Sequence, residues 1–330
     1  MSALRIGQCL LLWLITSSLA HAAWYSEKLN VMGTETGVTV EASTQAKAKQ
    51  LTQKVFNEFK RFDRLYSSYK ADSELSLVNQ HGFAQTQQLS DEFNYLIQRS
   101  LEFYSLSNGL FDITYASVGH QYDYRQRQQP NQQQLKQGLP LIDAKALLFD
   151  DHKHTLRFQH QGTRIDLGGI GKGYVVDRAI SLLQGAGVEH ASVYAGGDSR
   201  FLGQHGDRPW IMGIRHPRQA DQLALSMPID NAAVSTSGDY ERFFIDDQGQ
   251  RHHHIIHPKT GDSPKGVVSA TVIGDEAMTT DAMSTSVLLA GVKQGMQMIE
   301  KIQGLDAIVI DEFGKVYYTS GLVAPSAKGD

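Results

Sequence analysis

Apolar residues recur every three or four positions in several parts of the chain, which is the spacing of an amphipathic helix. The first such stretch spans residues 44–65. Ser43 and Thr44 lie at its start, and either residue can cap a helix N-terminus. A second stretch begins after Ser90 and ends at Gly109, a residue type that is common at helix ends. Further predicted helices span residues 172–183, 281–290 and 292–302.

Short stretches rich in β-branched and aromatic residues predict strands in the second half of the chain. They span residues 192–194, 210–215, 223–229, 241–245 and 267–273, and a final hairpin pairs 307–311 with 315–319. A glutamine-rich stretch, residues 126–137, is expected to be a solvated connection or a short surface helix. Because no repeat and no long linker divides the sequence, the pattern predicts one mixed α/β unit.

The first 22 residues have the pattern of a secretory signal peptide. Arg5 supplies a positive charge, residues 6–19 are apolar, and Ala22 completes an A-x-A cleavage site. The apolar stretch, about 14 residues, is shorter than the roughly 20 that a membrane-spanning helix needs. Cys9 lies before most of this stretch, whereas a lipoprotein cysteine lies at the cleavage point. We therefore expect cleavage after Ala22 and a soluble periplasmic protein, residues 23–330, without a stable membrane anchor.

The composition excludes cysteine chemistry and argues against a nucleic-acid partner for the mature chain. Cys9 is the only cysteine in the sequence, so disulfides and cysteine-based metal or redox sites are excluded after cleavage. Acidic residues outnumber lysines and arginines, 35 to 31, and the sequence has no basic run. A nucleic acid is therefore not an expected partner.

A glycine-rich segment precedes the predicted helix over residues 172–183. Four of the six residues from Gly168 to Gly173 are glycine. The backbone N–H groups of such a segment can approach an anion, and a helix N-terminus favours negative charge. The spacing is not that of a P-loop, since Gly173 follows Lys172, nor of a dinucleotide motif, since Tyr174 occupies the last glycine position. A tight strand-to-helix turn without a ligand is the alternative.

Two later segments carry hydroxyl and imidazole groups. Residues 234–243 hold small hydroxyl residues beside Gly238, which can bind a phosphate or a sugar or form a surface turn, and they lack the G-x-S-x-G elbow of hydrolases. The other segment contains His252, His253, His254 and His257. On a strand that ends at Pro258, neighbouring side chains point to opposite faces, so these four cannot converge on one zinc ion. A single catalytic or flavin-contacting histidine is favoured, with solvent-exposed histidines as the alternative.

Asp281 and Thr285 are four residues apart, so on a helix they share one face. A carboxylate, a hydroxyl and neighbouring carbonyl oxygens form a site that suits Mg²⁺, with substrate phosphates completing the coordination. The alternative is helix capping by Thr279, Thr280 or Asp281.

Together and in this order, these motifs resemble the ApbE family of FAD:protein FMN transferases. The resemblance runs from Met32 to the end of the chain. It also includes residues 68–76, 109–114, 195–198 and 213–217. It implies an α+β fold of the ApbE/T-fold-like type, with antiparallel-rich sheets flanked by helices.

The resemblance also implies an activity and its residues. Family members bind FAD and Mg²⁺, release AMP and attach FMN to a Thr or Ser hydroxyl of target flavoproteins, which are subunits of membrane redox complexes. The metal is expected on Asp281 and Thr285, with a backbone oxygen near Gly169. His254 is the candidate base for the target hydroxyl, because an imidazole titrates near the working pH. The expected FAD contacts are Met32, Tyr69, Leu110, Phe111, Asp112, Asp166, Lys172 and Ile255.

The chain departs from the family pattern at two places. His257 precedes Pro258 where the family has the Asp of H-x-x-D-P, which removes a carboxylate near the proposed base. Tyr115 begins a stretch that replaces the V-G-P-L of the family, so the flavin pocket wall is expected to differ. Two other activities share the same motifs: hydrolysis of FAD to FMN and AMP, and binding of FAD without turnover.

Overall fold

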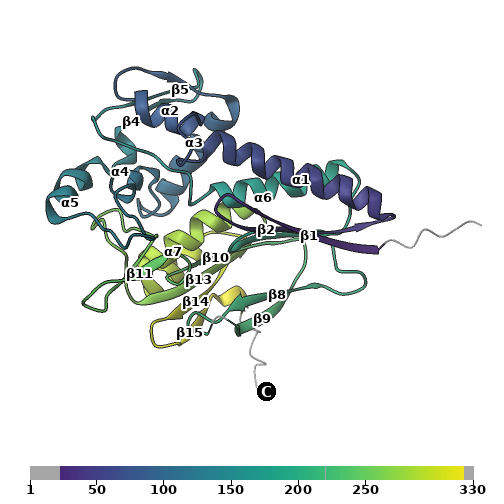
Figure 1. The fold of residues 1–330 in the computed structure, drawn as a ribbon. Coiled ribbons are helices and arrows are strands. Elements are labelled where there is room, and N and C mark those ends of the chain that lie inside the picture. Colours follow the sequence, from purple (N-terminus) through teal and green to yellow (C-terminus); the bar gives the residue numbers. More distant parts are fainter. Residues whose placement is uncertain (1–22, 220, 323–330) are drawn as a thin grey trace, which may run out of the picture.

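The computed structural model describes residues 23–219 and 221–322, and the predicted signal peptide lies outside them. Its largest element is an antiparallel sheet with the strand order β1-β2-β6-β7-β10-β13-β14-β15 (Figure 1). These strands are β1 (Ala23–Val31), β2 (Thr34–Ala42), β6 (Ala191–Ala195), β7 (Asp198–Leu202), β10 (Ala233–Gly238), β13 (Val267–Gly274), β14 (Asp306–Asp311) and β15 (Val316–Tyr318). The sheet supplies several of the strand ends that form the site described below.

Three long helices pack on one face of this sheet: α1 (Gln45–Tyr66), α6 (Gly171–Gly185) and α7 (Ala277–Ile299) (Figure 1). The predicted cap of the first helix is present, because the Thr44 side chain accepts a hydrogen bond from the Lys47 N–H. The apolar stripe of α1 is its buried face, formed by Ala48, Leu51, Val55, Phe59 and Phe62. Helical periodicity therefore predicted both the element and the side that packs inward.

The opposite face of the sheet is covered by a hairpin of β8 (Trp210–Arg215) and β9 (Leu223–Ile229). Burial alternates along β8, as expected for a strand with one packed face. Met212 and Ile214 from this hairpin pack against Val234 and Ile308 of the main sheet.

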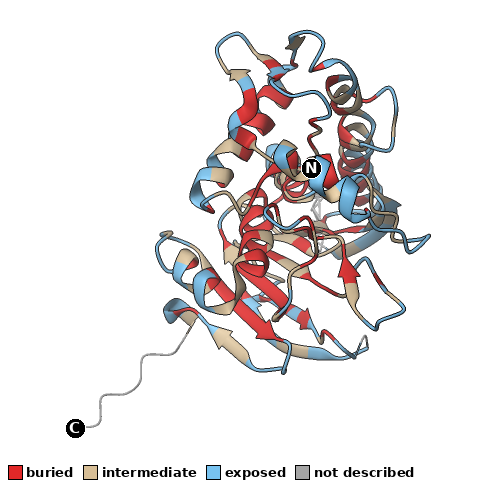
Figure 2. Cartoon of the chain, turned by 90° about the vertical axis from the view of Figure 1, so that its left-hand side faces the viewer, coloured by how far each residue is buried: buried red, intermediate tan, exposed pale blue. Residues whose placement is uncertain are grey.

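A second group of elements lies at one end of α1 and α6 (Figure 1). It contains the helices α2 (Glu74–His81), α3 (Asp91–Leu106), α4 (Ala116–Gly119) and α5 (Gln132–Gly138), and a small sheet of β3 (Gln87–Gln88), β5 (Thr155–Phe158) and β4 (Leu147–Asp150). One hydrophobic cluster joins this group to the main sheet, with Phe93 and Phe158 from the group and Val38 and Val193 from the sheet among its members. Buried residues accordingly run through both parts in Figure 2.

The mixed α+β class with antiparallel sheets is confirmed, as are most of the predicted elements. Within the described residues, none of the helices is long and apolar enough to cross a membrane. The glutamine-rich stretch contributes all of α5 except its last residue, and α5 is a short surface helix capped by Asn131. Gly291, with φ +76°, interrupts α7 where the pattern predicted a boundary between two helices.

The structure rules out two of the alternatives that the local pattern left open and corrects one predicted boundary. The last long helix begins at Ala277, with Glu276 as N-cap, so Asp281 lies inside the helix and does not cap it. The segment around Ser235 is an inner strand, β10, and not a surface turn, because its hydroxyl groups find partners on α7 and β13. The strand before the histidines is β12 (Arg251–His253), paired with β11 (Phe243–Ile245), and it ends at His253 instead of Pro258.

Candidate active site

The first turns of α6 and α7 lie against each other because glycine occupies position 173. A Cβ atom at Gly173 would lie 2.2 Å from the Ala277 carbonyl oxygen and 2.7 Å from the Met278 Cα atom. With no side chain in the way, the Gly173 N–H donates a hydrogen bond of 3.0 Å to Asp281 Oδ2. The glycine-rich segment therefore brings the backbone of α6 to a carboxylate on α7.

Asp177 of α6 fixes the start of α7. Its carboxylate accepts hydrogen bonds from the N–H groups of Ala277, at 2.9 Å, and Met278, at 2.8 Å. Arg200 of β7 pairs with the same carboxylate at 2.5 Å. Because Glu276 makes no side-chain cap of its own, Asp177 serves as the cap of α7 from a neighbouring helix.

We expect Gly173→Ala to destabilise the protein by about 3 kcal/mol, because the added methyl group must push α6 away from the α7 backbone. Gly185→Ala is the matched control at the end of the same helix, where nothing lies within 4 Å of the added Cβ. Alanine favours a helix over glycine by about 1 kcal/mol, so the control should be neutral or stabilising. Urea unfolding of both variants measures the difference, and equal effects would show that the close approach of α6 and α7 does not depend on glycine at position 173.

Two buried carboxylates and a lysine meet at these helix ends. Lys172 Nζ lies 2.6 Å from Asp198 Oδ2 and 3.4 Å from both carboxylate oxygens of Asp281. The two acids are 2% and 3% exposed, respectively. Burial, and then the charge of Asp198, raises the pKa of Asp281, while Lys172 and the Gly173 N–H oppose the shift. The cluster thus places two carboxylates beside a single lysine, an arrangement that leaves room for a further cation to balance their charge.

Hydroxyl groups complete the surroundings of this cluster. Thr285 lies one helical turn after Asp281 on α7, and its Oγ1 is 3.1 Å from Ser237 Oγ of β10. Ser237 Oγ also lies 2.9 Å from Ser284 Oγ. Ser235, two residues earlier in β10, has its hydroxyl bonded to α7 as well, which agrees with the two-residue repeat of a strand. The Thr285 hydroxyl is therefore oriented by the sheet beneath it.

Asp198 is a site residue that the sequence did not assign. It lies at the start of β7, where Gly196 and Gly197 form a two-residue turn between Ala195 and Asp198. Gly196 has φ +61°, and a Cβ atom at Gly197 would lie 2.5 Å from the Thr236 carbonyl oxygen. The sequence feature that could have indicated Asp198 is its place directly after the glycine pair of the A-G-G-D motif. This motif predicts the turn, but it does not predict which side chain the acid contacts.

His254 follows β12 directly and is held by the hydrogen bond from its N–H to the Arg242 carbonyl oxygen, at 3.0 Å. The side chain is partly exposed as a whole, but its Nδ1 atom is buried and has no hydrogen-bond partner among the described residues. Burial, followed by the charges of His253, Arg242 and Lys172, lowers the pKa of His254 to about 3. The imidazole is therefore neutral at physiological pH and near enough to Lys172 to respond to its charge.

The other three histidines are held by structural contacts. His252 lies between Asp246, 3.0 Å from its Nε2, and Asp262, 3.2 Å from its Nδ1. His253 Nε2 lies 3.2 Å from the Pro264 carbonyl oxygen. His257 Nδ1 accepts a hydrogen bond from the N–H two residues later, at 3.1 Å, which is the contact that an Asp side chain makes in an Asx turn. His257 thus occupies the turn position of the family's Asp without bringing a carboxylate.

The low pKa of His254 makes stability depend on pH. The unfolded chain binds a proton near pH 6.5 and the folded protein near pH 3, so stability is lost as the pH falls below about 6.5. We expect a loss of about 1 kcal/mol per pH unit from His254, reduced from the full value because the side chain is partly exposed. Urea unfolding at pH 7.5 and pH 5.0 should show a smaller difference for His254→Gln than for the wild type. His152→Gln, at an exposed position, is the control, and an unchanged pH dependence in His254→Gln would contradict the burial of a neutral imidazole.

Met32 and Gly33, the first predicted FAD-contact segment, form the turn between β1 and β2 with φ values of +57° and +69°. Met32 is unusual there because a residue with a side chain seldom adopts positive φ. Arg242 Nη2 donates a hydrogen bond of 2.9 Å to the Gly33 carbonyl oxygen. Since the Arg242 carbonyl also holds His254, the turn and the histidine are linked through one residue.

Aromatic side chains lie beside the glycine-rich segment. Asp166 Oδ1 accepts hydrogen bonds from the Gly168 N–H, at 2.7 Å, and from the Tyr115 hydroxyl, at 3.2 Å. Burial, and then Asp166, raises the pKa of Tyr115 well above its usual value, so the phenol remains a donor. Tyr69 is 90% exposed, and it is close enough to raise the pKa values of Tyr115 and Tyr124 further. Tyr115, where the chain departs from the family pattern, is therefore a hydrogen-bond partner of Asp166.

The remaining predicted FAD contacts form the wall behind this segment. Phe111 is buried, and a Cβ atom at Gly169 would lie 2.8 Å from its ring. Asp112 uses both carboxylate oxygens within the protein, for the N–H groups of Thr114 and Ala144. Ile255 belongs to the main hydrophobic cluster and Leu110 packs partly buried against it. These four residues therefore shape the site by packing and by hydrogen bonds within the protein, and polar contacts to a ligand fall to other residues.

The two helix ends meet over buried carboxylates, a lysine and hydroxyl groups, which are the kinds of group that enzymes of phosphoryl transfer use. The model of the ApbE family matches residues 32–309 of this chain. The chain belongs to the ApbE family.

Similar proteins include the FAD:protein FMN transferase of Vibrio cholerae, 28% identical over 327 residues, with 93% of this chain and 97% of the relative covered. That of Treponema pallidum is 28% identical, with 92% and 89% covered. Among solved structures, the ApbE protein of Thermotoga maritima has a TM-score of 0.83 at 30% identity and covers 91% of this chain and 98% of its own. The flavin transferase ApbE from Vibrio cholerae has a TM-score of 0.79 at 26% identity, with 91% and 98% covered. The family resemblance and the fold it implied are confirmed.

Proposed function

We propose that this chain transfers the FMN part of FAD to a Thr or Ser hydroxyl of another protein and releases AMP, with Mg²⁺ at the Asp281 cluster. The observation that carries the proposal is the buried group of Asp281, Lys172 and Asp198 at two helix ends, near a neutral His254. Its curated relatives are named FAD:protein FMN transferases.

The residues present fit a hard divalent cation. Asp281 and Thr285 offer a carboxylate and a hydroxyl from one face of α7, and the nearby Asp198 adds a second carboxylate. All are oxygen ligands, the kind that Mg²⁺ prefers. We propose that Asp281 and Thr285 hold Mg²⁺ together with a backbone oxygen near Gly169. Bound there, the ion would neutralise negative charge on the FAD pyrophosphate.

Three side chains have further proposed roles in the reaction. Lys172 carries a positive charge at the same place and is positioned to neutralise a phosphate oxygen. His254 is neutral, and its Nδ1, which has no partner among residues 23–219 and 221–322, can accept the proton of the acceptor hydroxyl. Its pKa of about 3 is low for a base, but a bound pyrophosphate would oppose the effect of Lys172 and Arg242 and raise that pKa. Tyr69 offers an exposed ring on which a flavin or adenine can stack.

Incubation with FAD, Mg²⁺ and a flavoprotein subunit carrying an acceptor threonine tests this function. We expect one AMP released for each FMN attached to the subunit, measured by chromatography and by the mass of the intact subunit. Free FMN beside an unlabelled subunit would instead identify an FAD hydrolase. FAD that stays intact would identify a flavin-binding protein without turnover.

We also propose export to the periplasm, with subunits of membrane redox complexes as acceptors. Strand β1 begins at Ala23, so cleavage after Ala22 removes no residue of the described fold. N-terminal sequencing of the protein from a periplasmic extract should begin at Ala23. A chain that keeps residues 1–22 and stays in the cytoplasm would contradict the proposal.

A further inference from the structure

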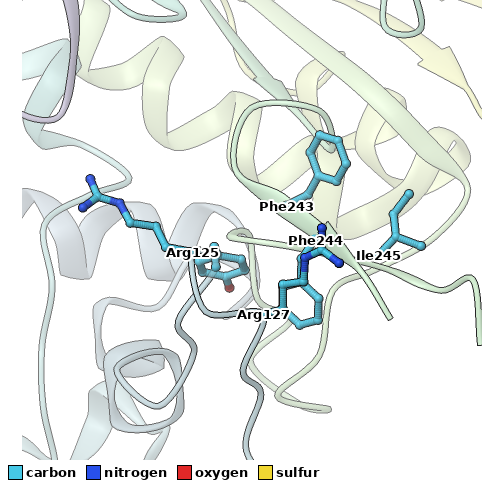
Figure 3. Close-up of a pocket in the computed structure, with 6 residues that line it drawn as sticks. Arg125, Arg127, Phe243, Phe244 and Ile245 are labelled. Carbon is cyan, nitrogen blue, oxygen red and sulfur yellow. The ribbon is translucent and has the colours of Figure 1, made fainter. Parts of the chain in front are cut away.

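A pocket of about 410 Å³ lies outside the predicted site residues, between strand β11 and the loop of residues 123–128 (Figure 3). It is lined by Tyr124, Arg125, Arg127, Phe243, Phe244 and Ile245. Figure 3 shows these side chains gathered between the loop and the strand, with Arg125 extending away from Phe243 and Ile245. Neither arginine nor any residue of β11 has a role in the FAD chemistry described above.

The strand side of the pocket is apolar and accessible. Phe243 is 37% exposed and Ile245 is 48% exposed, which is high for side chains of this kind. Phe244, between them, is buried and stacks on His252, with 5.0 Å between the ring centres. The Arg251 guanidinium lies 3.8 Å over the Phe243 ring and helps to fix it. Of the two exposed side chains, Phe243 is therefore held in place by Arg251.

The loop side of the pocket is positively charged. Arg125 and Arg127 are exposed, and within residues 23–219 and 221–322 neither forms an ion pair. The loop is held by Asp123, whose Oδ1 accepts hydrogen bonds from the N–H groups of Arg125 and Gln126, at 2.9 and 3.0 Å. Two unpaired guanidinium groups on an acidic chain favour a partner with carboxylates.

The pocket opens beside the proposed catalytic centre. The Tyr124 hydroxyl donates a hydrogen bond of 3.3 Å to the carbonyl oxygen of His253, the residue before His254. Tyr124 also lies near the exposed Tyr69, which further raises its pKa. A polypeptide seated in the pocket would therefore pass next to the histidine that is proposed to activate the acceptor hydroxyl.

We propose that this pocket binds the acceptor protein, through an extended segment that carries acidic and apolar side chains next to its threonine or serine. Carboxylates of the segment pair with Arg125 and Arg127, and its apolar side chains pack on Phe243 and Ile245. The inference rests on the proposed transferase function, because only a transferase must hold a second protein beside His254. It adds to that function the chemistry by which the acceptor is chosen.

Binding of two labelled peptides tests the proposal. Each is a rhodamine-labelled nine-residue peptide with a central threonine and two leucines, one with two aspartates and the other with two lysines in their place. The test variant is Arg125→Glu/Arg127→Glu. Its control is Lys54→Glu/Lys60→Glu, which reverses two exposed charges on α1 that form no ion pair within the described residues. Fluorescence anisotropy is measured with FAD present and EDTA added to prevent turnover, and FAD affinity is measured separately by flavin fluorescence.

The wild type and the control should bind the aspartate peptide about tenfold more tightly than the lysine peptide. The test variant should lose about tenfold in affinity for the aspartate peptide and prefer the lysine peptide, with its FAD affinity unchanged. Equal binding of both peptides by the wild type would overturn the proposal. Weaker FAD binding by the test variant would also overturn it, since the pocket would then belong to FAD. Because binding is measured without turnover, this result is independent of whether the wild type transfers FMN.

Discussion

Replacing Asp281 with alanine is expected to lower Mg²⁺-dependent AMP release from FAD by about a thousandfold or more. The carboxylate is the central acid of the buried cluster, bonded to the Gly173 N–H and 3.4 Å from Lys172. Without it, the proposed Mg²⁺ site loses its charged ligand, and negative charge on the phosphates is no longer neutralised at the reacting group. AMP release is followed by chromatography over a range of Mg²⁺ concentrations.

The fold of this variant should survive. Loss of the carboxylate leaves the Gly173 N–H without its acceptor, at a cost of about 1–3 kcal/mol. Lys172 keeps its partner Asp198 at 2.6 Å. The matched control is Asp275→Ala, which removes an exposed carboxylate just before α7. Circular dichroism and urea unfolding compare the two variants, and undiminished AMP release by Asp281→Ala would rule out the proposed metal site.

Replacing His254 with alanine should cost about a hundred- to ten-thousandfold in the rate of FMN transfer, the usual effect of losing a general base. The corresponding change at His257 should cost less than about tenfold, because its ring accepts a backbone N–H in a turn. We expect His257→Asp to transfer FMN faster than His257→Ala, since an Asp side chain can accept the same N–H. Transfer rates at saturating FAD and Mg²⁺ provide the comparison, and a larger loss in His257→Ala than in His254→Ala would mean that His257 is the base.

Local sequence patterns predicted the helices well because a helix is specified by contacts within a few residues. The stripe of α1 and the pairing of Asp281 with Thr285 on one face both follow from the helical repeat. The patterns failed where polar groups are buried by distant partners. Ser235 and Ser237 are hydroxyl residues of the kind found in turns, yet they lie in an inner strand because α7 satisfies their hydrogen bonds.

The individual motifs were thus visible in the sequence, but their shared geometry was not. The sequence showed a glycine-rich segment with Lys172 and a carboxylate–hydroxyl pair with Asp281, and the order of its motifs indicated the family. It did not show that Asp198 faces Lys172, because that contact depends on β7 lying next to β10 and on α6 and α7 crossing at Gly173.

The helical faces, including the shared face of Asp281 and Thr285, were therefore determined by the sequence alone, since each depends on residues close together in the chain. The order of the motifs along the chain indicated the family. Tertiary structure decided the rest. It paired Asp198 with Lys172, buried the Nδ1 atom of His254 and placed Arg125 beside β11. These contacts join residues tens of positions or more apart or depend on burial, and both are set by strand order and helix packing, which no local pattern encodes.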